Sequence, residues 1–364
     1  MGRGFYVLVL LTVGHAPTAW AQSSVTLFGT LDVGLSYISN EGGHGVAKFD
    51  DGIFTPSLIG LRGREDIGAG SHVVFELVSQ ISPGNGQLIG NGLFARTAYV
   101  GLQNDRLGTL TFGNQYEFMA ETLFFSGIDA AADVTGLYNL RNGPFQKLAL
   151  PGNPTGAFDW DRMAGSQRIA NAVKYVSPVF GGWKAGVLYA FGGVPGSIGA
   201  NNTVSVSLDY EAGPFGAAAA YTNEKYGAQP GSAATSVRNW GAGAHYQFGA
   251  VKLSGLLTTV RNSVSGGGVW MSEFGGTWQL TGPLRVGADY MYMKGNAALD
   301  DNHAHQVTAS VQYSLSKRTM VYASGAWQRA NSGAQAQING VMDPNGASSG
   351  ATQSIARIGL HTIF

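Results

Sequence analysis

Cysteine, charge and long apolar runs are all scarce in this chain. None of the 364 residues is cysteine, which excludes disulfide bonds and is compatible with an oxidising compartment. Charged residues make up 12% of the chain, whereas about a quarter is usual in a soluble protein. The longest apolar run, Val7–Val13, is shorter than the roughly 18 residues of a membrane-spanning helix. The composition therefore fits neither an ordinary soluble domain nor a helical membrane protein.

A net charge is also lacking. The 22 Lys and Arg residues balance the 22 Asp and Glu residues, so the chain has no global basic field. Nucleic acid is therefore not expected as a partner. Residues 1–21 resemble a secretory signal, with Arg3 before the apolar stretch Phe5–Val13 and an A-x-A cleavage site at Ala19–Ala21. We expect the signal to be cleaved and the mature chain, 22–364, to form a single domain.

What the chain has instead is a two-residue alternation of apolar and polar side chains. In the segment 25–38 the apolar residues fall on odd positions, namely Val25, Leu27, Leu31, Val33, Leu35 and Tyr37. Because side chains alternate between the two faces of a strand, each such segment has one apolar and one polar face. The pattern recurs as far as the terminal Phe364. It predicts an all-β outer-membrane barrel with the apolar face towards lipid, and favours this over a soluble sandwich with core-facing aromatics.

Sixteen segments show this pattern, and most are close to the length of a tilted membrane-spanning strand. Their connections alternate between short and long, which is typical of antiparallel barrels with short periplasmic turns and long outer loops. An even strand number also allows the sheet to close without free edges. The predicted strands are 24–38, 55–65, 71–81, 94–103, 108–116, 166–178, 182–192, 201–211, 214–224, 236–248, 250–261, 268–280, 283–294, 302–314, 318–330 and 352–364.

The alternation also predicts which way individual side chains face. In 236–248, Trp240 and Phe248 are expected to face lipid, and Asn239 and His245 to face the lumen. Aromatic residues near strand ends fit the girdles that lie at lipid headgroups. The expected girdle residues are Tyr37, Tyr99, Trp183, Tyr210, Trp278 and Tyr313.

A sixteen-stranded barrel encloses a wide water-filled channel, so a constriction inside it is expected. The candidate is the link 117–165, because a surface loop rarely exceeds about 15 residues. We expect this loop to fold into the lumen and to place acidic groups across the bore, opposite basic groups on inward faces of the wall. Such facing charges would set ion preference. The expected acids are Glu117, Glu121, Asp129 and Asp133, and the expected bases are Arg62, Arg64, Arg96, Arg168 and Lys174.

Several stretches resemble the general porins of proteobacteria, the group with neisserial and β-proteobacterial members. The resemblance lies in 22–32, Gly60–Asp66, Ala98–Leu102, 168–183 and Gly359–Phe364 among others, and spans the mature chain. It implies a homotrimer of sixteen-stranded barrels that passes small hydrophilic solutes and ions by diffusion. It also implies contact with outer-membrane lipid and lipopolysaccharide, and a terminal Phe364 that the barrel assembly machinery reads. Arg96 and Arg168 match two arginines of anion-selective members, whereas a third basic position is Leu58 here, which implies weak charge selectivity.

Other functions stay open at this level. A substrate-specific channel is the main alternative, because the loop 117–165 is rich in aromatic residues such as Phe124, Phe125 and Phe158. An enzyme is not expected, because no Ser–His–Asp grouping with supporting spacing is present. No cofactor is expected, and His303 and His305 lack the third ligand that a metal site would need. A receptor or adhesin role of the outer loops remains compatible with a pore.

Overall fold

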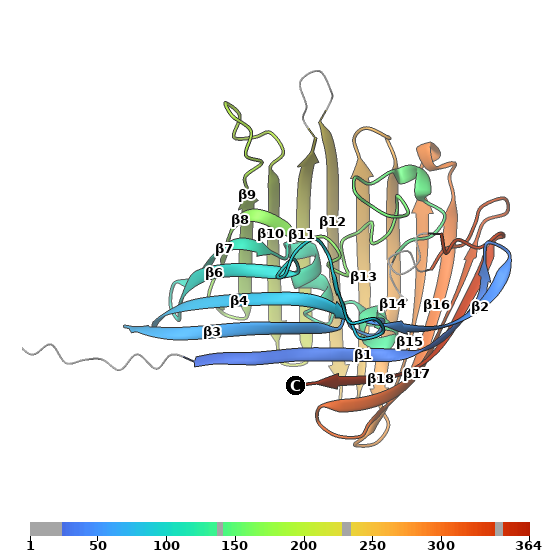
Figure 1. Cartoon of the computed structure of the whole chain (residues 1–364), viewed down its shortest axis with the longest axis horizontal. Helices are drawn as coiled ribbons and strands as arrows, with labels where there is room; N and C mark the ends of the chain where they lie inside the picture. The colour runs from blue at the N-terminus through green and yellow to red at the C-terminus, as the bar shows by residue number, and fades with distance from the viewer. Residues whose placement is uncertain (1–23, 137–140, 228–233, 339–344) are drawn as a thin grey trace, which may run out of the picture.

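The computed structural model describes residues 24–136, 141–227, 234–338 and 345–364, and these form one antiparallel β-barrel (Figure 1). The predicted signal peptide and the expected mature start at Gln22 lie outside the described residues. The strands are β1 (Ser24–Glu41), β2 (His44–Asp51), β3 (Leu58–Gly68), β4 (Ser71–Ser82), β5 (Gln87–Ile89), β6 (Thr97–Asn104), β7 (Gly108–Gln115), β8 (Ile169–Val176), β9 (Trp183–Ala190), β10 (Thr203–Ala212), β11 (Phe215–Tyr226), β12 (Thr235–Phe248), β13 (Val251–Asn262), β14 (Gly268–Gln279), β15 (Leu284–Gly295), β16 (His303–Ser314), β17 (Thr319–Ala330) and β18 (Thr352–Ile363).

Sixteen of these strands form the wall, as the sequence predicted. Each wall strand from β3 to β17 pairs antiparallel with the next wall strand along the chain, for example β4 with β6 and β9 with β10. The first strand closes the ring, because Ser24–Thr30 pairs with β3 while Thr30–Ile38 pairs with β18. No wall strand among the described residues therefore presents a free edge to lipid, where unpaired backbone groups would be costly.

Two described strands lie outside the sixteen predicted segments. In the pairing of described residues, β2 joins β1 alone and β5 joins β4 alone. Both fall inside links that the sequence predicted to be long loops, 39–54 and 82–93. They therefore extend two hairpins at the long-loop end of the barrel and do not change the size of the ring.

Exposure follows the predicted alternation in most strands. Trp240 and Phe248 are 50% and 58% exposed on the outer face, whereas Asn239 is buried inside. The prediction for Tyr99 is wrong. Its neighbour Val100 is exposed on the outer face, so Tyr99 faces the lumen, and it lies opposite Glu76 in the register. The segment's polar and apolar residues are too mixed here for parity to be read from sequence.

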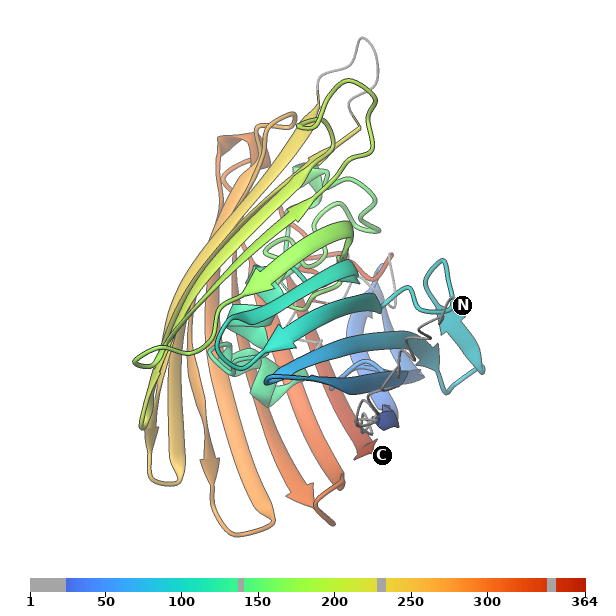
Figure 2. The same ribbon diagram turned by 90° about the vertical axis from the view of Figure 1, so that its left-hand side faces the viewer.

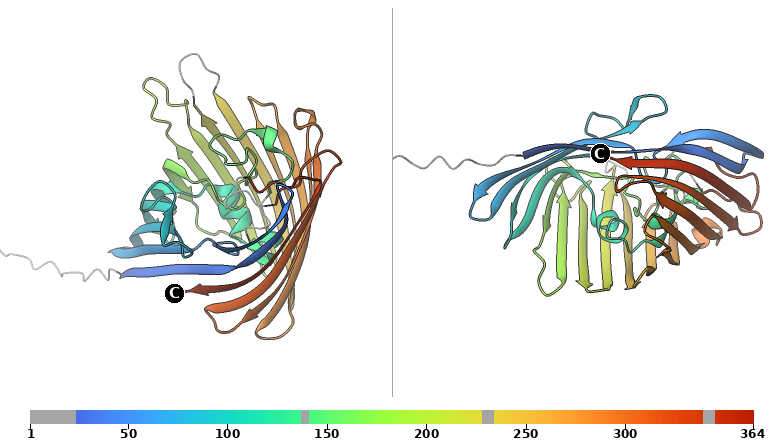
Figure 3. Two further views of the ribbon diagram at one scale, coloured as in Figure 1. Left: turned by 45° about the vertical axis from the view of Figure 1, so that its right-hand side comes forward. Right: turned by 90° about the horizontal axis from the view of Figure 1, so that it is seen from below.

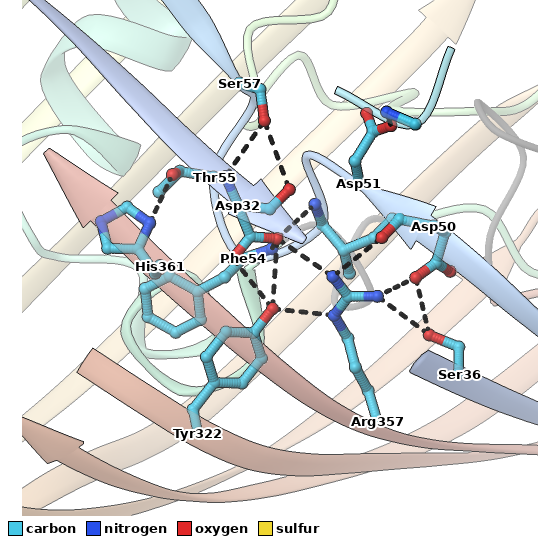
Figure 4. A network of polar contacts seen from close by, with 12 residues as sticks. Asp32, Ser36, Asp50, Asp51, Phe54, Thr55, Ser57, Tyr322, Arg357 and His361 are labelled. Atoms are coloured by element: carbon cyan, nitrogen blue, oxygen red, sulfur yellow. Dashed lines mark hydrogen bonds and ion pairs between the residues drawn. The ribbon is translucent and has the colours of Figure 1, made fainter. Parts of the chain in front are cut away.

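The closing seam is held from inside by a buried polar network (Figure 4). Arg357 of β18 reaches Asp32 of β1 at 3.2 Å and also pairs with Asp50 of β2. Tyr322 of β17 donates to Asp32 at 2.9 Å and accepts from Arg357 Nε at 2.7 Å. The backbone N–H groups of Ile53 and Phe54 donate to Asp32 as well. One carboxylate thus ties β1, β17, β18 and the segment after β2 together at the point where the ring closes.

The long link 117–165 lies inside the barrel, as Figures 2 and 3 show for the green segment within the ring of strands. Its described part contains a π-helical turn η1 (Met119–Phe124), a short helix α1 (Ala130–Val134) and a 3₁₀ turn η3 (Gln146–Leu148). A second 3₁₀ turn, η4 (Ala297–Leu299), lies between β15 and β16. No helix among the described residues is long and apolar enough to cross a membrane.

Candidate functional site

The loop 117–165 rests on an apolar area of the inner wall. Loop residues Met119, Leu123 and Trp160 are completely buried. They belong to one cluster with inward-facing wall residues, which include Leu256, Val260, Val269, Met271, Met291 and Met293. A water-filled lumen would disfavour apolar groups at inward positions, so their presence on β13–β15 is explained by the loop that covers them. The loop is therefore packed against one side of the wall instead of hanging free in the channel.

A buried arginine fixes the middle of the loop to β14. Arg141 lies 2.6 Å from Asp129 and 3.4 Å from Asp161, and it also pairs with Glu273 of β14. Asp129 caps α1 by accepting from the N–H of Ala132 at 3.0 Å, while Glu273 accepts from the N–H of Ala131 at 2.9 Å. Burial raises the pKa of Asp161 to about 6. Removal of the Arg141 side chain would leave these three carboxyl groups buried without the cation that pairs with them.

A second anchor holds the two ends of the loop. Glu117 accepts from the N–H of Met119 at 2.8 Å and from the N–H of Ala120, and Thr222 of β11 donates to it. Arg162 reaches Glu224 of β11 at 2.5 Å and Asn239 of β12 at 3.1 Å. Glu117 and Arg162 are both buried.

Two of the four expected acids therefore do not face the bore. Glu117 and Asp129 are fully buried, because each satisfies backbone N–H groups where the loop meets the wall. The other two remain partly exposed and pair with basic groups of the wall. Glu121 pairs with Lys174 of β8, and Asp133 lies 3.1 Å from Lys252 of β13.

Arg96 and Arg168 come together at one aromatic ring. Their guanidinium carbons lie 5.7 and 5.4 Å from the centre of the Tyr116 ring, a cation–π arrangement. Arg96 also donates to Gln80 at 2.6 Å, and Arg168 donates to the Ser166 carbonyl at 2.7 Å. Burial lowers the pKa of Arg96 to about 10, so the group is still charged at neutral pH.

Both arginines line a cavity of about 290 Å³ between the loop and the wall. Gln80, Asn153 and Phe158 are also part of its lining. Among the described residues, no carboxylate lies within salt-bridge distance of either guanidinium, in contrast to Lys174 and Lys252. The two arginines thus place two positive charges at this cavity without a carboxylate in direct contact among the described residues, while the nearby buried Asp159 offsets part of the charge of Arg96.

The remaining two expected bases lie elsewhere on the wall. Arg62 is on the inner face of β3, opposite Glu76 of β4 in the register, and its guanidinium carbon lies 5.0 Å from the centre of the Phe28 ring. Arg64 is two residues closer to the short turn after β3 and is exposed. The structure therefore brings Arg96 and Arg168 together but does not bring Arg62 and Arg64 to them.

Phe364 lies at the barrel seam. Its N–H donates to the Gly29 carbonyl at 3.0 Å and its carbonyl accepts from the Gly29 N–H at 3.1 Å. The ring lies over Gly29 so closely that a Cβ there would collide with it. It is also 47% exposed, which leaves the side chain accessible at the outer surface.

Sequence reasoning missed the residues that hold the loop, namely Arg141, Arg162 and Lys252. The sequence did contain a signal for the wall area that the loop covers, since Met271, Met291 and Met293 are apolar residues at positions that the alternation assigns to the lumen. The described residues contain no group of three or more side chains that could hold a metal ion. His303 and His305 have the same parity in β16 as exposed Val307 and so lie on the outer face.

Comparisons with known proteins agree with this architecture. The family model described as Gram-negative porin matches residues 7–333. The outer membrane porin protein 32 of Delftia acidovorans is 29% identical, and the match covers 98% of this chain and 99% of that protein. An outer membrane porin protein of Bordetella pertussis is 26% identical over 88% of this chain and 92% of its own length.

A solved structure gives the same result. The anion-selective porin from Comamonas acidovorans superposes with a TM-score of 0.76 at 26% identity, and the match covers 94% of this chain and all of that one. The closed barrel, the inward-folded loop and the family match over most of the chain lead to one conclusion. This chain belongs to the Gram-negative porin family and is located in the outer membrane, where it forms a passive channel.

Proposed function

We propose that the channel is a general diffusion pore for ions and small hydrophilic solutes with a weak preference for anions. The observation that carries this proposal is the pair Arg96 and Arg168, which faces a cavity without a carboxylate partner among the described residues. The basic groups Lys174 and Lys252 are matched by loop acids, so they contribute less to the net field. The similarity to an anion-selective porin supports a preference for anions over cations.

Planar-bilayer recording under a KCl gradient tests the proposal. The wild-type protein should give ohmic steps with a reversal potential of anion-selective sign. Arg96→Gln/Arg168→Gln should shift the reversal potential towards the value of a cation-selective pore, because it removes two positive charges that have no salt-bridge partner among the described residues. Lys147→Gln is the control, since Lys147 is exposed and pairs with Asp300 at 2.6 Å, away from Arg96 and Arg168. An unchanged potential in the double variant would refute the role of these arginines.

A substrate-specific channel is the second candidate. Its support is the cavity lined by the two arginines and Phe158, which could hold an organic anion with an apolar part. Concentration-dependent block of single-channel current by such a solute, absent in Arg96→Gln/Arg168→Gln, would favour it. Current that scales with solute size alone would favour the general pore.

We infer that three copies assemble, that the barrel assembly machinery reads Phe364, and that the chain contacts lipopolysaccharide. These inferences are supported by the resemblance to trimeric porins and by the exposure of the terminal ring. The mass of the folded protein in detergent and its change to monomer on heating test the trimer. Phe364→Ala should lower the yield of folded barrel in cells while leaving conductance of the folded fraction unchanged.

A further inference from the structure

The link between β2 and β3 turns into the barrel and is tied to one residue of β1. The backbone N–H groups of Ile53 and Phe54 donate to the Asp32 carboxylate at 3.0 and 3.1 Å. At the other end of the link, the N–H of Asp32 donates to the Ser57 hydroxyl at 3.1 Å. We call the residues 52–57 the inner segment, since Ile53 is buried among inward residues of β1, β17 and β18. Asp32 itself belongs to the polar network of the closing seam, so the inner segment has a fixed place there (Figure 4).

The aromatic ring of Phe54 packs on the last two strands of the barrel. Its centre lies 5.0 Å from the centre of the Tyr322 ring of β17 and 5.7 Å from that of the His361 ring of β18. Thr55 adds a polar contact with β18, since its hydroxyl lies 3.2 Å from Nδ1 of His361 (Figure 4). Both the backbone and the side chains of the inner segment are therefore held by the wall.

The loop 117–165 touches the inner segment at Gly136, two residues after α1 ends. A Cβ atom at Gly136 would collide with the carbonyl group and the Cα of Phe54, so the two backbones lie in direct contact. Gly136 also has a φ of +60°, a conformation that favours glycine. Because backbone atoms meet here, no side chain can rotate to let the loop come closer. The inner segment thus limits how far this end of the loop can approach the seam.

The inner segment also borders the cavity at Arg96 and Arg168. Pro56 is part of the cavity lining, together with residues of the loop, and its ring is rigid. The carbonyl of Ser57 accepts from the N–H of Ile81 of β4 at 2.9 Å, which fixes this end of the segment to the wall. The cavity is therefore bordered by three elements, namely the wall that carries the arginines, the loop and the inner segment.

We propose that the inner segment is a third element of the constriction and limits the size of the solutes that pass Arg96 and Arg168. Phe54 keeps the end of the loop at a fixed distance from the seam, and Pro56 occupies space beside the arginine pair. The inner segment contains no charged residue, so it contributes bulk to the bore and no field. The inference rests on the proposed diffusion function and deepens it, because it assigns size selection and charge selection to different residues.

Liposome swelling with uncharged sugars of increasing size tests this role. Pro56→Gly removes the ring at the cavity and should raise the swelling rate for a trisaccharide, relative to that for a monosaccharide, about twofold. Its reversal potential under a KCl gradient should stay at the wild-type value, because no charge is removed. Pro214→Gly is the matched control, since Pro214 is exposed in the short turn between β10 and β11 and its loss should leave the ratio unchanged. A wild-type ratio in Pro56→Gly would overturn the inference.

A second variant tests the contact between the loop and the inner segment. Gly136→Ala places a methyl group against the Phe54 backbone, so the loop and the segment cannot both keep their positions, and the single-channel conductance should shift from the wild-type value. Gly249→Ala is the matched control, because Gly249 has nearly the same φ, +58°, but a Cβ there meets open space in a short turn. Equal conductance of the two variants would also overturn the inference. If Gly136→Ala does not fold, Pro56→Gly decides the question, since it creates no collision.

The outcomes for the inner segment and for the proposed function can be told apart. A folded wild-type protein without ohmic channels in KCl would refute the diffusion pore, and the role of the inner segment with it. Wild-type channels together with an unchanged sugar ratio in Pro56→Gly would refute the inner segment alone.

Discussion

The two sides of the lumen differ in what their inward residues contact. On β13–β15 the inward positions include Leu256, Met271 and Met291, which lie beneath the loop 117–165. On β3 and β4 they include Arg62 and Glu76, which carry charge into the channel. Both sides obey the same two-residue alternation. The difference shows that inward positions are polar where water reaches them, whereas beneath the folded loop they are apolar or, like Glu273, paired with a loop residue.

The largest expected effect comes from removing the cation beneath the loop. Arg141→Met leaves Asp129, Asp161 and Glu273 buried without their partner, which should cost about 3–5 kcal/mol. Thermal unfolding of the folded barrel measures the loss. Lys147→Met is the comparison, since its pair with Asp300 is mostly exposed and should be worth about 0–1 kcal/mol. Similar unfolding temperatures for the two variants would show that the loop is not held by this cluster.

Adjacent leucines on β13 compare the covered inner face with the lipid face. Leu256 is buried beneath the loop, whereas Leu257 is 49% exposed on the outside. Leu256→Ala should cost about 2–5 kcal/mol because it leaves a cavity, and Leu257→Ala should cost less because lipid fills the space. Denaturant unfolding in the same detergent ranks the two variants. A larger loss for Leu257→Ala would reverse the assignment of faces.

Acids on the loop should differ in their effect on selectivity. Glu121→Gln removes a partly exposed charge and frees Lys174, so the reversal potential should shift towards anions. Glu117→Gln should leave the potential unchanged and lower stability, because Glu117 is buried against Met119 and Thr222. Bilayer recordings of both variants test this. A shift from Glu117→Gln as large as that from Glu121→Gln would place both acids at the bore.

The smallest expected effect is a pH dependence of the protein's stability that arises from Asp161. Its pKa is about 6 in the folded protein and 3.8 in its ordinary environment, so the folded state binds the proton more tightly. This stabilising contribution is complete below about pH 4 and is lost as pH rises through about 6. The unfolding temperature of the wild type should fall more over this range than that of Asp161→Asn. If the unfolding temperatures of the wild type and Asp161→Asn change equally with pH, the proton is bound by another group.

Sequence alone predicted the wall far better than the loop. The sixteen wall strands could be predicted from the alternation, because lipid on one face and water on the other impose a two-residue period on most of them. The contacts that Arg141 and Arg162 make with the wall could not be predicted, since Glu273 and Glu224 are distant in the chain and no period reveals the pairing. Likewise β2 and β5 are hairpin extensions, which no membrane boundary imposes. Tyr99 shows the limit of parity where a strand has few clearly apolar residues.

The hydrogen bonds between Phe364 and Gly29 have a consequence for biogenesis. One of the two partners of β1 is β18, which lies more than 300 residues further along the chain, and the hydrogen bonds between Gly29 and Phe364 extend this pairing. This edge of β1 therefore stays without its partner until β18 has been synthesised. The ring cannot close before β18 is available, and a chain that lacks the end of β18 would leave an open seam in an otherwise complete sheet.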